Sequence, residues 1–191
     1  MARLLLSLDP GRKNFAYSGV SDEGKIIYCG MIENVIENMS SAMIFNTQME
    51  KLKEELDLIP IWKNTRVIYE RFIPRSLNKG NTSEIIMAHI GMILNQWNLF
   101  YIPITAATWK SYYNRNNLWV KNDSLPPHIL DSFFIAYWYY LKKKILSINE
   151  VKACLKKVEN KNFNWYCYRG QWINGNRPVE HNRGKRNSFG N

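Results

Sequence analysis

The chain of 191 residues has few cysteines and no hydrophobic segment long enough for a membrane helix. Cys29, Cys154 and Cys167 are odd in number and form no CxxC pair, which argues against a disulfide framework and against a zinc ribbon. The longest apolar run, residues 133–141, has nine residues, less than half the length that a bilayer span requires. We therefore expect a soluble protein of a reducing, cytoplasmic-type compartment.

Acidic residues are scarce in the last quarter of the sequence. Residues 142–191 hold 12 Lys and Arg against three Asp and Glu, whereas residues 1–141 hold 14 against 13. Most of the net charge of +10 therefore belongs to residues 142–191. Such a charge suits a polyanionic partner.

The spacing of apolar residues predicts a mixed α/β protein. Strands are expected at residues 3–8, 14–20, 25–33, 66–69 and 100–104, the first three as an antiparallel meander. Helices are expected from residue 39 to about 59 and at residues 83–99, 106–113, 128–141 and 148–158. We predict a mixed five-stranded sheet flanked by helices over residues 1–146, followed by a basic, aromatic-containing extension over residues 147–191.

Three carboxylates occupy positions that this fold could bring together. Asp9 closes the first strand, Glu70 closes the fourth, and Asp131 lies one turn into the helix at 128–141. His128 precedes Asp131 by three residues and shares its helix face. Magnesium prefers carboxylate oxygens, and two divalent ions held in this way can activate water against a phosphodiester.

Each of these residues also has an ordinary interpretation. Asp9 before Pro-Gly suits a turn, Glu70 could form a surface ion pair with Arg71, and His128 could cap its helix or pack in the core. Asp131 is different, because the residues after it are almost entirely apolar and a lone buried carboxylate is costly unless it is paired or binds metal. The joint arrangement favours a metal site more than any single residue does.

Three short motifs, LLSLDPGRKNFAYSGV, VIYERF and HILDSFFIAYW, resemble those of the RuvC-type Holliday junction resolvases of the RNase H-like superfamily, particularly the small phage forms. The resemblance covers residues 3–140 and implies an RNase H-like fold. It also implies a structure-selective DNA endonuclease that resolves four-way junctions by two-metal hydrolysis. Other branched DNA is a further candidate substrate. The location implied is the cytoplasm, that of the host if the source is viral.

The resemblance assigns the catalytic and metal-binding roles to Asp9, Glu70, His128 and Asp131. Asp9 would bridge two Mg²⁺ ions, Glu70 would hold one, and Asp131 with His128 would hold the other. Because an imidazole nitrogen softens that site, Mn²⁺ should be able to substitute.

Basic residues near these positions are candidates for DNA binding. Arg71, Arg75 and Lys79 follow Glu70, in a loop well placed to hold phosphates near the metals. The resemblance adds Lys110 and Lys121 as phosphate contacts and Phe72 as the aromatic residue that opens the junction. The alternatives are solvated loop lysines and a core phenylalanine.

Two of the helices that family members carry can be compared with this sequence. The helix at residues 83–99 is apolar on two faces and matches the family's dimerisation helix, so the resemblance implies a homodimer; a monomer with an extra covering layer is the alternative. Only six residues separate Lys121 from His128, so the helix that family members carry ahead of the catalytic helix is missing here.

The extension interleaves aromatic residues with arginines, which suits stacking on unpaired bases or, equally, a small hairpin packed on the domain.

Two other functions also fit the sequence. An RNase H-like nuclease for RNA or RNA–DNA hybrids would use an acidic residue of the first helix, where Glu50 is available. A non-catalytic nucleic-acid-binding protein would bind in a salt-dependent way without metal-dependent cleavage.

Overall fold

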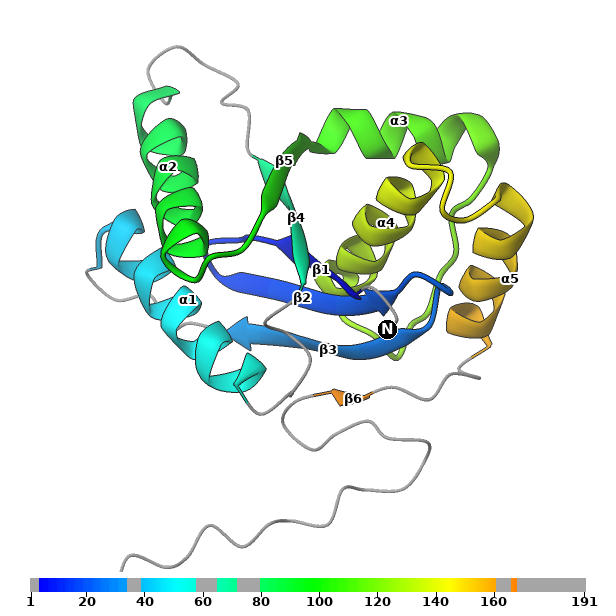
Figure 1. The fold of residues 1–191 in the computed structure, drawn as a ribbon, viewed down its shortest axis with the longest axis horizontal. Coiled ribbons are helices and arrows are strands. Elements are labelled where there is room, and N and C mark those ends of the chain that lie inside the picture. The colour runs from blue at the N-terminus through cyan, green and yellow to red at the C-terminus, as the bar shows by residue number, and fades with distance from the viewer. Residues whose placement is uncertain (1–3, 34–38, 58–64, 72–79, 161–165, 168–191) are drawn as a thin grey trace, which may run out of the picture.

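The elements follow one another in the order that the hydropathy pattern predicts (Figure 1). The computed structural model describes residues 4–33, 39–57, 65–71, 80–160 and 166–167. The strands are β1 (Leu4–Asp9), β2 (Asn14–Ser21), β3 (Ile26–Glu33), β4 (Arg66–Arg71), β5 (Tyr101–Thr105) and the two-residue β6 (Tyr166–Cys167). The helices are α1 (Ser41–Leu56), α2 (Gly80–Gln96), α3 (Ala106–Asn116), α4 (Pro127–Lys142) and α5 (Ile148–Glu159).

The sheet has the strand order β5-β4-β1-β2-β3-β6. β1, β2 and β3 form the expected antiparallel meander. β4 pairs with β1 and β5 pairs with β4, both in parallel. The predicted mixed five-stranded sheet is confirmed, and β6 adds a short parallel strand beside β3.

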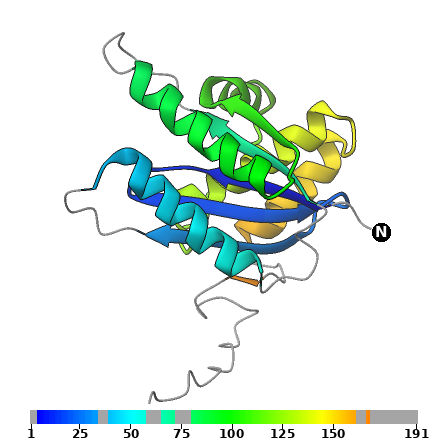
Figure 2. The same cartoon turned by 60° about the vertical axis from the view of Figure 1, so that its left-hand side comes forward.

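Helices cover both faces of the sheet. Alternate residues of β1 point to opposite faces, so that Leu6 packs with α1 and α2 whereas Leu5 packs with the residues of α3, α4 and α5. Figure 2 shows α1 and α2 together on one side of the strands, with the other helices behind them. Among the described residues, no helix is both long and apolar enough to cross a bilayer.

Helix α4 is the most deeply buried helix of the core. Apart from Asp131, every residue from Ile129 to Leu141 is buried. Two of its tyrosines tie it to the meander: the Tyr137 hydroxyl donates to the Gly24 carbonyl oxygen at 3.0 Å, and the Tyr140 hydroxyl donates to that of Val20 at 2.6 Å. These bonds fix the position of α4 against the strand that neighbours β1.

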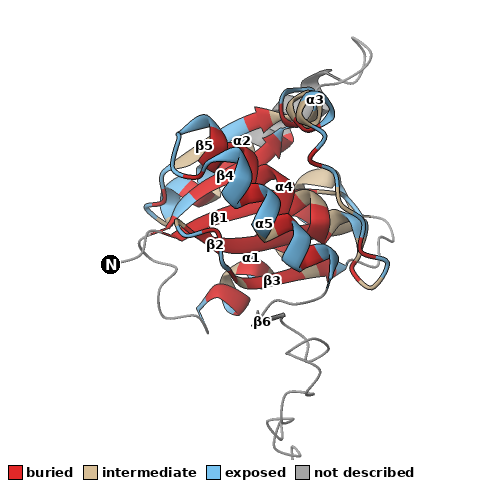
Figure 3. Cartoon of the chain, turned by 90° about the vertical axis from the view of Figure 1, so that its right-hand side faces the viewer, coloured by how far each residue is buried: buried red, intermediate tan, exposed pale blue. Residues whose placement is uncertain are grey.

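Helix α5 lies in the expected extension and packs onto α4. The predicted capping box is present, since Ser147 and Glu150 each bond to the other's backbone N–H. Val151 and Leu155 join the core cluster around α4, while the outer face of α5 is exposed (Figure 3). The extension is therefore joined to the domain through a packed helix.

Helix α3 is longer than the sequence pattern predicts. The polar residues 114–116 were expected in a loop, but the structure makes them the last turn of the helix. Their side chains bond back along the helix, with Arg115 bound to Ser111 and Asn116 to the Tyr112 carbonyl. The helix ends at Asn117, whose φ of 50° provides a left-handed cap.

Candidate active site

Parallel pairing of β1 and β4 brings two carboxylates side by side. Leu8 pairs with Tyr69, so the next residues, Asp9 and Glu70, stand at the same end of neighbouring strands. Leu8 and Tyr69 face α1 and α2, and strand alternation therefore directs Asp9 and Glu70 toward α4. Both carboxylates are buried, with exposed fractions of 6% and 8%.

The first turn of α4 lies next to this pair. The His128 ring Nδ1 is 2.8 Å from Asp9 Oδ2, and because an ionised carboxylate can only accept, the imidazole N–H donates. Asp131, one turn further along α4, is half-buried, and its charge acts on both Asp9 and Glu70. The structure thus brings together all four residues that the sequence assigns to catalysis.

Two consecutive residues of α3 hold two of these carboxylates. The Trp109 indole Nε1–H donates to Glu70 Oε2 at 2.8 Å, and Lys110 Nζ lies 3.3 Å from Asp131 Oδ2. Lys110 Nζ also lies 4.8 Å from the centroid of the Trp109 ring. Sequence reasoning included Lys110 as a phosphate contact but missed Trp109, whose only signal was its place directly before Lys110.

Burial raises the pKa of all three carboxyl groups. The pKa of Asp9 rises to about 6, first because the group is desolvated and then because Glu70 and Asp131 repel its charge, while the His128 hydrogen bond opposes the rise. Burial also raises the pKa of Glu70, against the hydrogen bond from Trp109, and that of Asp131, against Lys110. The site concentrates negative charge that a cation would relieve.

The donor set suits a hard divalent cation. Three carboxylates and one imidazole fit Mg²⁺, with Mn²⁺ as a substitute. As the side chains stand, however, no three His, Cys, Asp or Glu residues in the described part of the chain are grouped closely enough to enclose one ion. His128 contacts Asp9, and Lys110 contacts Asp131, so an ion would have to compete with these two partners.

The other candidate residues lie around this cluster or beyond it. Arg71 is exposed at the end of β4, and Lys121 is exposed in the loop between α3 and α4. Phe72, Arg75 and Lys79 lie outside the described residues. Glu50 is exposed on α1, on the opposite face of the sheet from α4, and its carboxylate accepts from Asn46 Nδ2 at 2.8 Å.

The fold is similar to that of solved RuvC structures. A structure of Thermus thermophilus RuvC in complex with a Holliday junction substrate matches with a TM-score of 0.56 and 12% identity, over 75% of this chain and 97% of that chain. A second structure of T. thermophilus RuvC matches with a TM-score of 0.54 and 13% identity, over 74% and 97%. No family profile matches the sequence, and no curated protein does.

These matches show the fold. The chain has the RNase H-like fold of RuvC, and the resemblance drawn from its three sequence motifs is confirmed at that level.

Proposed function

We propose that this protein is a metal-dependent DNA endonuclease that cuts four-way junctions, and other branched DNA, at the cluster of Asp9, Glu70, His128 and Asp131. The observation that carries the proposal is the convergence of these four side chains at the ends of β1 and β4 and the first turn of α4. The RuvC fold supports it, and one of the RuvC structures is a complex with a Holliday junction substrate.

The chain's own residues would divide the work as follows. Asp9, Glu70, Asp131 and His128 would hold Mg²⁺ or Mn²⁺, which supplies an activated water and neutralises charge on the phosphate in the transition state. Trp109 orients Glu70 through its indole N–H. Lys110, which lies 3.3 Å from Asp131 Oδ2 beside the cluster, would contact the phosphate that is cut.

Cleavage of a synthetic four-way junction by the Asp9→Asn variant tests the proposal. We expect the wild-type protein to cut in Mg²⁺ or Mn²⁺, and the variant to bind the junction but cut it at least about 10³-fold more slowly, because it lacks a ligand charge. Asp57→Asn, a change of the same type on the exposed end of α1, serves as the control and should cut normally. Undiminished cleavage by Asp9→Asn would refute the proposed site.

Substrate comparison separates the alternatives. The branched-DNA function predicts preference for a junction over a linear duplex and over an RNA–DNA hybrid, with no effect of Glu50→Gln, since Glu50 lies across the sheet. Preference for the hybrid would favour the RNase H-like alternative, and binding without any metal-dependent cut would favour the architectural one.

A further inference from the structure

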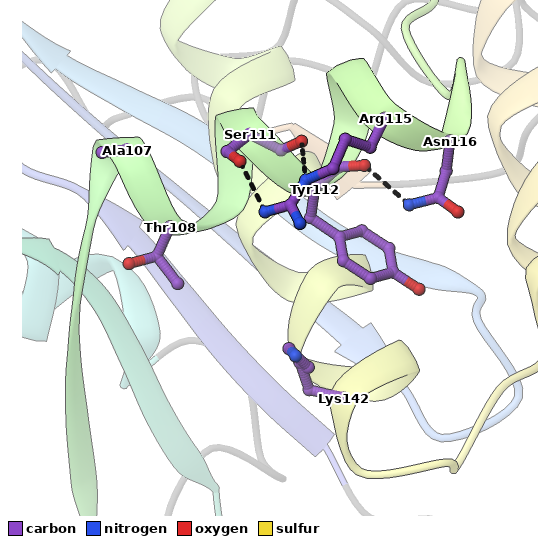
Figure 4. A pocket seen from close by; sticks show the side chains of 7 residues that line it. All are labelled: Ala107, Thr108, Ser111, Tyr112, Arg115, Asn116 and Lys142. Atoms are coloured by element: carbon purple, nitrogen blue, oxygen red, sulfur yellow. Dashed lines mark hydrogen bonds between the residues drawn. The ribbon is translucent and has the colours of Figure 1, made fainter.

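A groove of about 620 Å³ lies between α3 and the C-terminal end of α4 (Figure 4). It is lined by Ala107, Thr108, Ser111, Tyr112, Arg115 and Asn116 of α3 and by Lys142 of α4. Two of these side chains are cationic, several carry polar donors, and none is acidic. Figure 4 shows the Tyr112 ring directed from α3 toward Lys142.

The surroundings of the groove extend its positive charge. Helix α3 contains no Asp or Glu, and neither does the segment from residue 132 to residue 149. Within that segment Lys142, Lys143 and Lys144 are all exposed. The charged side chains of these two stretches, which lie between Asp131 and Glu150 on one side and within α3 on the other, are therefore all cationic.

Arg115 is held in place at the groove. Its Nη2 donates to Ser111 Oγ at 2.8 Å and its Nε donates to the Ser111 carbonyl oxygen at 3.3 Å (Figure 4). A guanidinium carries five N–H donors, so donors remain for a ligand. Lys142 Nζ lies 5.8 Å from the centroid of the Tyr112 ring. In the described part of the chain neither cation forms an ion pair with a carboxylate.

The Lys142 end of the groove lies away from the candidate active site. Lys142 follows Asp131 by 11 residues on α4, which places it about 16 Å further along the helix axis. On α3, Arg115 follows Lys110 by five residues, a rotation of about 140° around the helix. Lys110 thus faces the carboxylates from one flank of α3, while Arg115 faces the groove from the other.

We propose that this groove binds the phosphodiester backbone of a duplex DNA arm, at a distance from the cut. The inference rests on the proposed function and adds a second contact to it. Arginine with a neighbouring hydroxyl and a lysine suits phosphate oxygens, which accept hydrogen bonds and carry charge. At 3.4 Å per base pair, a separation of about 16 Å corresponds to about five base pairs, so an arm that runs along α4 should meet Lys142 roughly five base pairs from the cut.

Binding of a four-way junction to the double variant Arg115→Gln, Lys142→Gln tests this, measured by fluorescence anisotropy over a series of salt concentrations. The double variant and the protein with the intact groove both carry Asp9→Asn so that the junction is not cut during the measurement. We expect the affinity to fall about 10-fold and the slope of log K against log salt to become shallower by about two, one for each lost phosphate contact. The matched control, Lys51→Gln with Lys53→Gln, removes the same charge from α1 on the opposite face.

Methylphosphonate substitution locates the contact on the DNA. Neutral linkages four to six base pairs from the cut should weaken binding of the protein with the intact groove and leave binding of the double variant unchanged. Linkages placed 12 to 14 base pairs away should affect neither protein.

The outcomes separate this inference from the proposed function. Unchanged binding by the double variant, or an equal loss in the α1 control, would overturn the groove as a DNA site while leaving the nuclease intact. Failure of the protein with an intact groove to bind any DNA would overturn both. The inference is supported if the double variant binds DNA more weakly and neutral linkages weaken binding of the intact protein in the same way. That result would hold even if the natural substrate were branched DNA other than a four-way junction.

Discussion

Burial, a hydrogen bond from His128 and repulsion by neighbouring carboxylates all act on the pKa of Asp9. Its pKa of about 6 means that the folded, metal-free protein holds a proton there that the unfolded chain releases near its ordinary pKa of 3.8. Between these two values the folded state binds more protons than the unfolded state, so stability falls as the pH rises through the interval. At neutral pH the ionised carboxylate is a cost that a bound cation would remove.

Asp9→Asn should therefore stabilise the metal-free protein at pH 7, by up to about 3 kcal/mol, and have little effect below pH 4. The check is chemical denaturation in EDTA at a series of pH values from 4 to 8, comparing the free energies of unfolding of the two proteins. Adding Mg²⁺ at pH 7 should stabilise the wild type more than the variant. A difference between them that does not change with pH would contradict the prediction.

At the scale of elements, α3 joins the two halves of the site. Trp109 reaches Glu70 on β4, and the next residue, Lys110, reaches Asp131 on α4. Both residues belong to a helix anchored by the Trp109 and Tyr113 rings, which pack against Phe134 of α4. The helix therefore fixes the separation between a strand carboxylate and a helix carboxylate.

Trp109→Phe should weaken Mn²⁺ binding about 10-fold or more, because it keeps an aromatic ring but removes the N–H that orients Glu70. Calorimetric titration of the folded protein with Mn²⁺ measures this directly. Trp119→Phe is the matched control: its ring packs against Trp109 and Phe134, but its N–H donates to Asn114. Equal loss in both variants would mean that the ring packing, and not the hydrogen bond, supports the site.

The sequence predicted the elements well where one physical rule decides them. Alternation and helical spacing located the strands and helices, and the parallel pairing of β1 with β4 made the meeting of Asp9 and Glu70 foreseeable. The indole contact of Trp109 was not foreseeable, because it depends on how one side chain is placed in three dimensions. The last turn of α3 was not predicted, because a run of Asn and Arg is typical of a loop. The hydrogen bonds from Arg115 and Asn116 back to the helix are visible only in the structure.

At the scale of the whole molecule, the outer side of α2 leaves large apolar groups in solvent. Met92 on α2 is 59% exposed, and Phe100, just after it, is 66% exposed. The proposed cutting of a four-way junction on two strands would need two active sites, and the described part of one chain holds one such cluster of carboxylates. A second copy of this chain, related by a two-fold axis through α2, would supply the other and cover these side chains.

If two copies pair through α2 as proposed, Met92→Glu should convert the dimer into a monomer, because it would place a charge in the paired face. Sedimentation velocity, with and without junction DNA, measures the change. The monomeric variant should produce single nicks in place of paired cuts. Ile148→Glu, at the first residue of α5, where the side chain is 37% exposed, is the control. A wild-type protein that sediments as a monomer in both conditions would contradict the dimer.

The hydrogen bond between Asp9 and His128 spans 119 positions of the chain. During synthesis the first strand leaves the ribosome long before the helix that completes the cluster, and the long loop between them must close before the site exists. A nascent or prematurely terminated chain that ends before α4 therefore lacks His128 and Asp131, two of the four residues of the candidate site. The proposed cutting activity would therefore require a finished domain, in which α4 has been synthesised and packed against β1.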